Sequence, residues 1–366
     1  MNFGSLTFCI TMFIIIVIYG SNTNAYKITD NNYLSRGVNK FSVKLFKFAS
    51  MNETGNIIIS PLTIHVILSI FAFNSTESTI RDFENVLELR INNNYIFTQY
   101  RDLIDNLRGE SIASTTPNSI KAFSLIDVRL REITTGNRFT FANDKQPSSE
   151  MRYIDIYFNA EWREKFSKYS TTRKFFYNGN TNTRVQMMSM QSYFEYGRIT
   201  EANATFIKIP FRDNDCYMLI VLPDDMNGLR NVEDVLETLT LEQITRNGLS
   251  TIVDLNLPKF KVNCVMDLKV VSQKMGIDRL LTNYFFNNDH VESSTSQIIH
   301  QATINISEGG TKDRVEDGYE YNSFVPLYLP PSVRFNVNHP FHYKIIKRIN
   351  NNEEIVLFVG NIKTLL

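Results

Sequence analysis

The sequence predicts an α+β domain in which helices come first and the strands of large, mainly antiparallel sheets follow. Between residues 33 and 107, apolar residues recur at the three- and four-residue spacing of amphipathic helices. After Met151 the pattern changes to short β-branched or aromatic runs separated by turn residues. No Gly/Ser/Pro-rich linker and no internal repeat interrupts the chain, so one domain over residues 26–366 is expected.

Six segments have the pattern of helices. Residues 33–49 place Leu34, Val38 and Phe41 at helical spacing. Ser60 and Pro61 suit the N-cap and the first turn of the next helix, which continues through residue 70. The same reasoning predicts helices at residues 79–89, 100–107, 232–239 and 267–275. Strands are expected at residues 153–158, 206–210, 217–222, 252–257, 298–306, 333–337 and 355–358.

Residues 1–25 have the pattern of a signal peptide. They hold no charged side chain, and the apolar run from Leu6 to Tyr19 is shorter than the roughly 20 residues that a membrane span needs. The small residues Thr23 and Ala25 suit cleavage before Tyr26. A signal anchor is the alternative. We therefore expect a secreted, extracellular protein, without a membrane-spanning segment after the signal peptide.

Composition excludes several function classes. The formal net charge is zero, so no concentrated basic surface for nucleic acid is expected. Neither a G-x-S-x-G nucleophile motif nor a phosphate-binding glycine loop occurs, and His339 and His342 do not have the placement of a metal pair. His65 and His300 are expected to be core or interface histidines. The sequence thus predicts no enzyme, no cofactor and no metal site, and we expect a monomer.

In a chain that is expected to be secreted, cysteines can form disulfides and sequons can be glycosylated. Removal of the signal peptide leaves Cys216 and Cys264, which the sequence allows either to pair or to remain two buried thiols. Asn52, Asn74 and Asn203 begin sequons that are plausible surface glycosylation sites. A fourth sequon begins at Asn305 inside a predicted strand, where a glycan would obstruct sheet pairing, so this one is expected to stay unmodified.

The segment from Ile304 to Phe341 has the layout of an exposed bait loop. A strand leads into Glu308-Gly309-Gly310-Thr311, a long polar stretch follows, and Pro330-Pro331 precedes the next strand. Glycine tolerates the large backbone changes that a hinge requires.

Motifs in a shared order from Asn56 to the C-terminus resemble those of the serpin family, the serine protease inhibitors. The motifs are Asn56–Ile64, Tyr157–Trp162 with Phe166, Val185–Met188, Ile209–Phe211 with Met218–Pro223, Leu257–Phe260, His300–Ala302 and Phe335–Ile345. The resemblance implies a serpin-like single domain with a large central, mainly antiparallel sheet, further sheets, surrounding helices and an exposed reactive-centre loop. It also implies a sheet-opening region that includes Ser60, Trp162 and His300.

Two departures accompany the resemblance. The segment between residues 107 and 153 is shorter than in the family, which points to missing early strands and a missing helix. Ile154-Asp155 stands where the family usually has Asn-Ala in the centre of a strand. The second change removes a polar side chain from the sheet-opening region and adds a carboxylate that needs a partner.

The resemblance implies suicide inhibition, in which a protease cleaves the loop and the freed segment inserts into the main sheet from its hinge, Glu308, Gly309, Gly310 and Thr311. Alternate side chains of an inserting strand face the core, and here they include Asp313 and Asp317. Burial of unpaired carboxylates opposes insertion. Two functions therefore stay open: a secreted regulator of serine endopeptidases, or a non-inhibitory serpin that binds or carries a ligand or competes as a substrate.

The reactive bond has two candidate positions. The usual family spacing from the hinge points to Phe324 and Val325, while counting back from the two prolines points to Leu327 and Tyr328. These aromatic and aliphatic residues suit chymotrypsin-like or elastase-like proteases as targets. No basic residue lies between Asn322 and Leu329, so trypsin-like enzymes are not expected.

Overall fold

The computed structural model describes most of the chain from residue 33 onward. The described ranges are residues 33–51, 53–73, 76–91, 94–108, 152–158, 160–179, 181–212, 215–277, 298–311, 332–350 and 353–365. Contacts among residues 34–366 form a single compact unit. Several predictions concern residues outside the described ranges: the signal peptide, the shortened segment before residue 153, Asn52, Asn74 and all four reactive-bond candidates, Phe324, Val325, Leu327 and Tyr328.

Each helix predicted from periodicity is present, with ends that differ by a few residues. The helices are α2 (Tyr33–Ser50), α3 (Pro61–Phe73), α4 (Glu77–Leu87), α5 (Asn94–Arg108), α7 (Leu229–Leu236), α8 (Leu241–Thr245) and α9 (Leu268–Lys274). In α2, Val38, Phe41 and Leu45 are buried at helical spacing, as the pattern predicts. The largest boundary shift is in α5, which begins at Asn94, while the apolar pattern suggested residue 100.

The larger sheet has nine strands and is mainly antiparallel. Its order is β1-β12-β11-β6-β5-β4-β7-β10, and β3 pairs with β4 off this path. The strands are β1 (Ile57–Ile59), β3 (Thr172–Tyr177), β4 (Asn182–Ile199), β5 (Ala204–Pro210), β6 (Cys216–Pro223), β7 (Leu249–Pro258), β10 (Val333–Asn336), β11 (Phe341–Asn350) and β12 (Glu353–Ile362). Among the described strands of this sheet, β10 and β7 form the one parallel pair. These features confirm the predicted α+β fold class.

A second sheet contains the hinge strand. Its described strands are β2 (Arg152–Tyr157), β9 (Ile298–Ile306) and β8 (Phe260–Asp267), in the order β2-β9-β8. β2 and β9 are parallel and directly paired from Arg152↔Ile298 to Tyr157↔Thr303. β8 and β9 are antiparallel. The parallel pair means that no other strand lies between β2 and β9.

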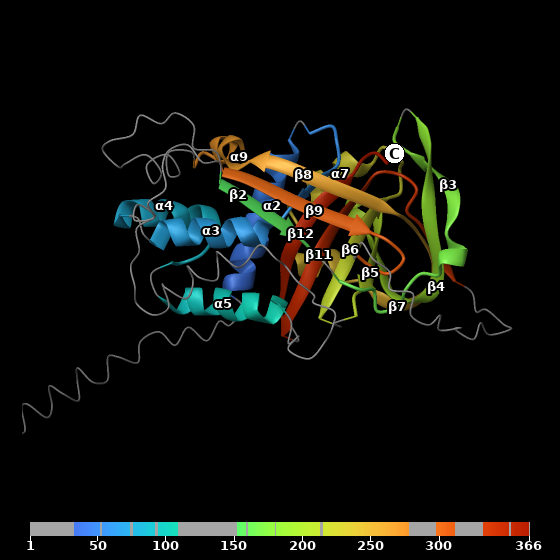
Figure 1. Cartoon of the computed structure of the whole chain (residues 1–366), viewed down its shortest axis with the longest axis horizontal. Coiled ribbons are helices and arrows are strands. Elements are labelled where there is room, and N and C mark those ends of the chain that lie inside the picture. Colours follow the sequence, from blue (N-terminus) through green and yellow to red (C-terminus); the bar gives the residue numbers. More distant parts are fainter. Residues whose placement is uncertain are drawn as a thin grey trace, which may run out of the picture. The chain divides into compact units, whose positions relative to one another are not determined.

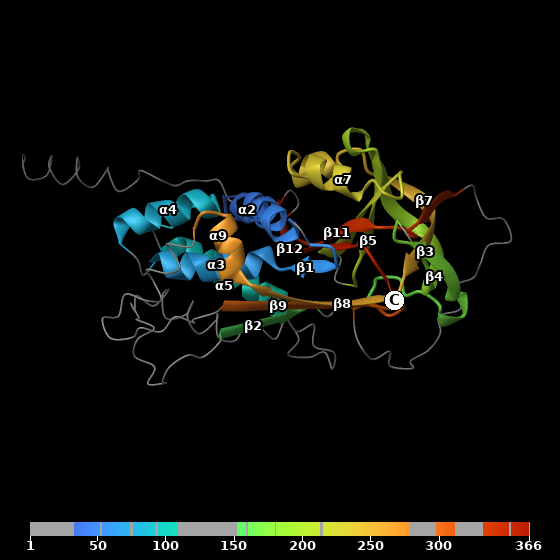
Figure 2. The same cartoon turned by 90° about the horizontal axis from the view of Figure 1, so that it is seen from above.

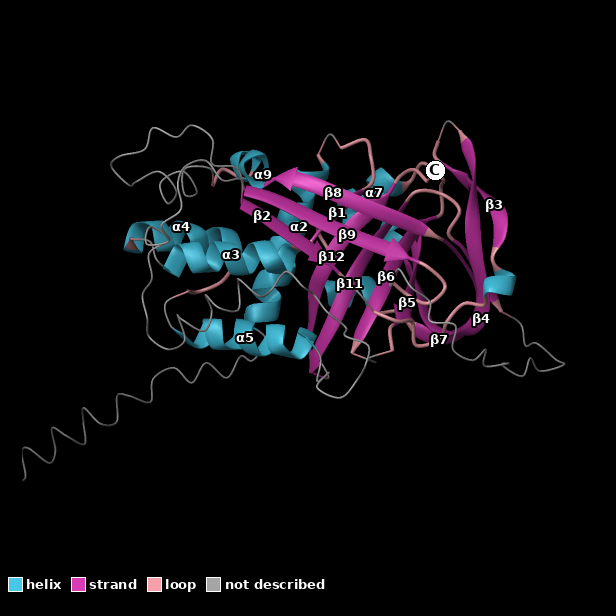
Figure 3. Ribbon diagram, viewed as in Figure 1, coloured by secondary structure: helices cyan, strands magenta, loops and turns pink. Residues whose placement is uncertain are grey.

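The elements are arranged in layers. Figures 1 and 2 show the β2-β9-β8 sheet as one layer, with β1, β11 and β12 of the larger sheet behind it. On the opposite side of β11 and β12 lie α2 and α7 (Figure 2). Helices α3, α4, α5 and α9 gather at one end, while β3 and β4 lie at the other (Figure 3). The hinge strand β9 therefore lies over a buried sheet, and the start of α3 lies close beneath it.

The two cysteines of the domain are not joined by a disulfide. Cys216 is buried in β6 and Cys264 is half-buried in β8, so they belong to different sheets. This selects the second of the two alternatives that the sequence left open. Within the described ranges, no helix has both the length and the apolar character to cross a bilayer, and no His/Cys/Asp/Glu cluster suits a metal.

Candidate functional site: the hinge and the sheet beneath it

The predicted hinge forms a closed turn at the end of β9. Ser307 N donates to Gly310 O over 2.8 Å, and Gly310 N donates back to Ser307 O over 3.1 Å. Gly310 has a φ of +130°, a conformation that residues with a side chain rarely adopt. A Cβ on Gly310 would lie 2.2 Å from Ala160 O. The turn thus requires glycine at this position, and it brings Gly310 beside Glu161 in an antiparallel bridge.

Backbone hydrogen bonds join the hinge to the segment that follows β2. Trp162 N donates to Gly309 O over 3.1 Å, and Thr311 N donates to Ala160 O over 2.8 Å. The Thr311 hydroxyl accepts from Ala160 N over 2.6 Å, and Thr311 is only 5% exposed. Thr311 is therefore already held at the edge of the sheet, at the point where insertion would begin.

Glu308 adds an ion pair to the same region. Its backbone oxygen accepts from Phe166 N over 3.0 Å. Its carboxylate lies 2.9 Å from Lys259 Nζ and accepts from the Thr171 hydroxyl over 3.0 Å. Burial by itself would raise the pKa of Glu308, but the hydrogen bonds from Lys259, the backbone and Thr171 together lower it. The charged carboxylate thus links the hinge to the loop between β7 and β8.

Trp162 anchors the segment that holds the hinge. Its ring is almost fully buried and stacks on Phe211 with ring centroids 4.5 Å apart. Phe166 meets it edge-on, and Trp162 Nε1 donates to Ser307 O over 2.9 Å. The buried ring thus fixes the segment that bonds the hinge, and a role of Trp162 in sheet opening stays a prediction.

Ser60 and His300 meet beneath the middle of the β2-β9 pair. Ser60 N, just before α3, donates to His300 Nε2 over 3.1 Å. The Ser60 hydroxyl donates to Leu357 O over 2.8 Å and lies 3.0 Å from Thr63 Oγ1. Burial lowers the pKa of His300 to about 4, so the ring is neutral at physiological pH. These contacts connect the hinge strand, α3 and β12.

Within the described part of the chain, the other nitrogen of His300 has no partner. Because Nε2 accepts a hydrogen bond, the neutral ring carries its proton on Nδ1. This buried donor has no acceptor among the described residues. The residue paired with His300 across the parallel strands is Ile154, whose side chain contains no hydrogen-bonding atom. His300 and His65 are both buried, as expected for core residues, but His300 bonds through one nitrogen, whereas His65 bonds through both.

The structure brings the predicted site residues into two groups. Glu308, Gly309, Gly310, Thr311 and Trp162 meet at the hinge, whereas Ser60 and His300 lie under the middle of the sheet. Three contributors to the hinge were not predicted, namely Ala160, Thr171 and Lys259. The motif Leu257–Phe260 contained Lys259, but nothing in the local sequence pointed to Glu308, which lies 49 residues away along the chain.

Of the predicted glycosylation sites, the structure describes Asn203. It is exposed, with a left-handed φ of 46°, at the end of a short 3-10 helix (Thr200–Ala202). Its backbone groups bond Thr200 and Asp224, so the turn does not depend on the side-chain amide. Asn305 pairs with Lys261 of β8 inside the hinge sheet.

Comparisons with known proteins agree with this geometry. The family model described as Serpin (serine protease inhibitor) matches residues 36–129 and 134–364. Antitrypsin of Bombyx mori is 32% identical over 200 residues, which are 52% of this chain and 50% of that protein. Intracellular coagulation inhibitor 2 of Tachypleus tridentatus is 23% identical over 410 residues, with 99% of each protein covered.

Solved structures share the fold. The crystal structure of human thyroxine-binding globulin has a TM-score of 0.69 at 19% identity, and the match covers 91% of this chain and 98% of that one. At this identity the likeness shows the fold alone. The family model, however, matches most of the chain and includes the hinge segment Glu308–Thr311. The chain belongs to the serpin family, as its motifs predicted.

Proposed function

We propose that this serpin is a secreted regulator of serine endopeptidases, with residues 312–331 as its bait segment. The observation that carries the proposal is the hinge: β2 and β9 are directly paired, and Gly310 is bridged and Thr311 bonded to the segment that follows β2. This is the arrangement that a serpin needs before cleavage, because the position for an additional strand is still closed. The protein then acts on peptidases and is not itself an enzyme.

Insertion requires the separation of β2 from β9. A strand that continues from Thr311 runs antiparallel to β9, and it would bond to both neighbours once they part. The six register pairs between β2 and β9 must break first, whereas the bonds of Thr311 to Ala160 already lie where the new strand begins. The new strand restores hydrogen bonds on both of its edges, so the completed sheet has one more strand and no lost pairing.

The sequence of the bait segment opposes complete insertion. With Thr311 buried, alternation sends Asp313, Val315 and Asp317 toward the same face of the sheet. Each unpaired carboxylate taken into the interior costs on the order of several kcal/mol or becomes protonated. We therefore propose slow insertion, so that many cleavage events release a cut serpin and an active protease.

The candidate bonds favour proteases with apolar specificity pockets. Phe324, Val325, Leu327 and Tyr328 offer aromatic or aliphatic side chains. Chymotrypsin-like and elastase-like enzymes are the proposed targets.

A binding or carrier role is the second candidate. It is favoured by the same charged residues, Lys312 to Asp317, because a protein that does not insert its loop has no need of small residues there. Thyroxine-binding globulin, whose name describes a binding function, has the same fold. The fold alone therefore does not decide between the two roles.

The test is incubation of the purified protein with chymotrypsin and elastase, followed by SDS gel electrophoresis. Inhibition predicts an SDS-stable complex in addition to the cleaved serpin. The variant Asp313→Ala/Asp317→Ala should raise the share of complex several-fold, because the inward face loses both carboxylates. Thr311→Arg should abolish the complex without preventing cleavage, since the first buried position would then carry a charge.

The outcomes separate the two candidates. If neither the natural protein nor the double alanine variant forms a complex or gains thermal stability after cleavage, the inhibitory proposal is wrong and the binding role remains. Secretion is tested independently by N-terminal sequencing of the exported protein, which should begin at Tyr26. Loss of a glycan mass in Asn203→Gln, with Asn305→Gln as control, tests the proposed surface glycosylation.

A further inference from the structure

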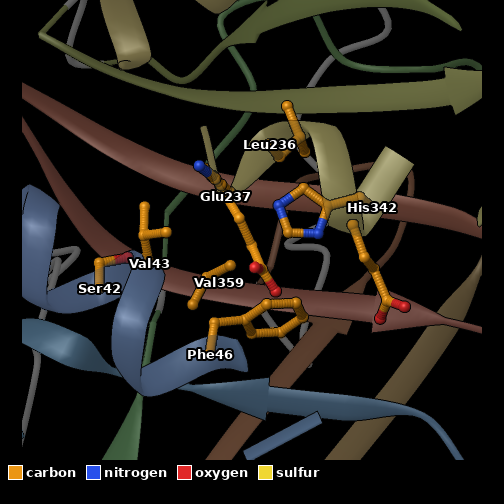
Figure 4. Close-up of a pocket in the computed structure, with 9 residues that line it drawn as sticks. Ser42, Val43, Phe46, Leu236, Glu237, His342 and Val359 are labelled. Atoms are coloured by element: carbon orange, nitrogen blue, oxygen red, sulfur yellow. The ribbon is translucent and has the colours of Figure 1, made fainter. Parts of the chain in front are cut away.

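The cavity beside His342 is too small to be a ligand site. It lies between α2 and α7, near Phe46 and Leu236, and has room for about one water molecule (Figure 4). Outside the hinge, the described residues instead offer a reactive group at the surface. This group is the side-chain amide of Asn178, in the turn that joins β3 to β4.

An asparagine that is followed by glycine can modify itself. The backbone nitrogen of the glycine attacks Cγ of the asparagine, the bond from Cγ to Nδ2 breaks, and ammonia leaves with the proton of the backbone nitrogen. The product is a five-membered succinimide ring, and addition of one water molecule opens it to aspartate or isoaspartate. Glycine favours this reaction because it has no side chain that hinders the approach.

The chain contains three such pairs, Asn178-Gly179, Asn227-Gly228 and Asn247-Gly248. The fold restrains the glycine nitrogen in the second and the third pair. Gly228 N donates to Asp225 O over 2.9 Å, and Gly248 N donates to Thr245 O over 3.0 Å. Each nitrogen must give up its hydrogen bond before it can attack. Gly179 N, in contrast, donates to no acceptor among the described residues.

The turn also polarises the amide of Asn178. Thr181 N and the Thr181 hydroxyl both donate to Asn178 Oδ1, each over 2.8 Å. Attack on Cγ places negative charge on this oxygen, so the two donors are arranged as an oxyanion hole. Asn178 N donates back to Thr181 O over 3.1 Å and holds the two residues together. Within the described ranges, neither Asn227 nor Asn247 accepts a hydrogen bond on its side-chain oxygen.

We propose that Asn178 is a site of spontaneous deamidation and that it reacts ahead of Asn227 and Asn247. It combines the two features that the other pairs lack, namely a glycine nitrogen without a described acceptor and an amide oxygen that accepts two hydrogen bonds. Asn178 is half-buried and Gly179 is exposed, so water and hydroxide reach the pair. This modification is independent of the proposed peptidase regulation.

The two products differ in their effect on the hairpin. Aspartate keeps an oxygen for both donors of Thr181, and its charge strengthens these hydrogen bonds. Isoaspartate lengthens the main chain by one carbon atom next to the pair Tyr177↔Asn182, which closes the β3-β4 ladder. Because Tyr177 N also donates to Asn338 O, isoaspartate is expected to disturb the contact between this hairpin and the segment that follows β10.

Peptide mapping by mass spectrometry measures deamidation at all three pairs in one sample of the full protein at pH 8. Water labelled with oxygen-18 marks each new carboxylate, and isoaspartate distinguishes ring opening from direct hydrolysis of the amide. In the folded protein, we expect Asn178 to react about tenfold faster than Asn227 or Asn247. In urea the three rates should converge, because the restraints of the fold are lost.

The donor of the Thr181 hydroxyl is tested with two variants. Thr181→Val keeps a β-branched side chain but loses this donor, so deamidation of Asn178 should slow roughly tenfold while Asn227 and Asn247 react as before. Thr181→Ser keeps the hydroxyl and should react like the natural protein. Circular dichroism establishes that both variants are folded.

Three results would overturn the proposal. The first is a folded protein in which Asn178 forms no isoaspartate. The second is a rate at Asn227 or Asn247 that equals or exceeds the rate at Asn178. The third is an unchanged rate at Asn178 in Thr181→Val, which would show that the hydrogen bonds on its amide oxygen do not promote the reaction.

Discussion

The two regions that keep β2 beside β9 differ in how completely their buried polar groups are bonded. At the hinge, Thr311, Glu308 and Ala160 all have partners, and Trp162 bonds through both its backbone and its ring. Under the middle of the sheet, His300 has one bonded nitrogen and one buried donor that finds no acceptor in the residues that the structure describes. An unpaired buried donor costs about 1–3 kcal/mol.

This difference indicates where the proposed separation of β2 from β9 would begin. The middle of the β2-β9 pair is the weaker region, whereas the hinge is held by an ion pair and by a turn that only glycine adopts. Separation of the strands is therefore expected to begin near Ile154 and His300 and to reach Ala160 last. The following changes weaken or strengthen one region at a time, in order of decreasing effect.

The largest effect is expected from Gly310→Ala. The φ of +130° and the 2.2 Å approach of a Cβ to Ala160 O force the turn to rearrange. The expected loss in the free energy of unfolding is about 3 kcal/mol, combining backbone strain with overpacking. Thermal unfolding measures it, and Gly55→Ala is the control because a Cβ there meets nothing within 4 Å. Equal melting temperatures for the two variants would show that the hinge turn does not need glycine.

Acid should weaken the middle of the sheet before it affects the hinge. The pKa of His300 is about 4 in the folded protein and about 6.5 when unfolded, so its contribution is fully present above pH 6.5. That contribution is lost as the pH falls toward 4. Between pH 7 and pH 5 the loss amounts to about 2 kcal/mol.

Denaturant unfolding of the natural protein and of His300→Gln measures this loss. Glutamine keeps an acceptor for Ser60 N but does not titrate, so the natural protein should lose about 2 kcal/mol more than the variant between pH 7 and pH 5. His65 and His342 titrate in both proteins, and their effects cancel in the difference. Parallel pH curves for the two proteins would contradict the assigned role of His300.

The ion pair at the hinge is tested by Lys259→Met. The variant leaves the Glu308 carboxylate 8% exposed with Thr171 as its remaining side-chain partner. Because Lys259 is one-third exposed, we expect a modest loss of about 1.5 kcal/mol at pH 7. The folded-state pKa of Glu308 is lowered, so this contribution is present above the unfolded pKa and disappears as the pH falls through the folded value. If Lys259→Met is still less stable than the natural protein at pH 3, the lost stability comes from packing of the aliphatic part of Lys259 and not from the ion pair.

The sequence predicted the elements better than the contacts between them. Residues 298–306 form β9 as expected, because a β-branched run between turn residues is a local signal. The strand β4 was missed, since its exposed residues are interspersed with buried Val185, Met187 and Met188 without strict alternation. The partners of Glu308, which are Lys259 and Thr171, lie in distant segments, and no local pattern encodes them.

The hinge could be predicted from the sequence, whereas the unpaired nitrogen under the middle of the β2-β9 pair could not. Gly309, Gly310 and Thr311 form a short motif whose conformation follows from glycine itself. The unpaired nitrogen of His300 depends on a register between strands that are 146 residues apart, Ile154↔His300. The exchange of Asn-Ala for Ile-Asp suggested a lost polar contact, but only the structure identifies His300 as the group that lost it.

The smallest effect tests the middle of the sheet directly. Ile154→Asn places an amide at the position paired with His300, and Ile156→Asn makes the same chemical change opposite Ala302 on the same face of β2. Both variants lose an aliphatic side chain, but only the first offers an acceptor to the unpaired Nδ1. Ile154→Asn should therefore be about 1 kcal/mol more stable than Ile156→Asn in denaturant unfolding. If the order is reversed, the unpaired donor of His300 is not what weakens this region, and the difference between hinge and middle must lie in packing.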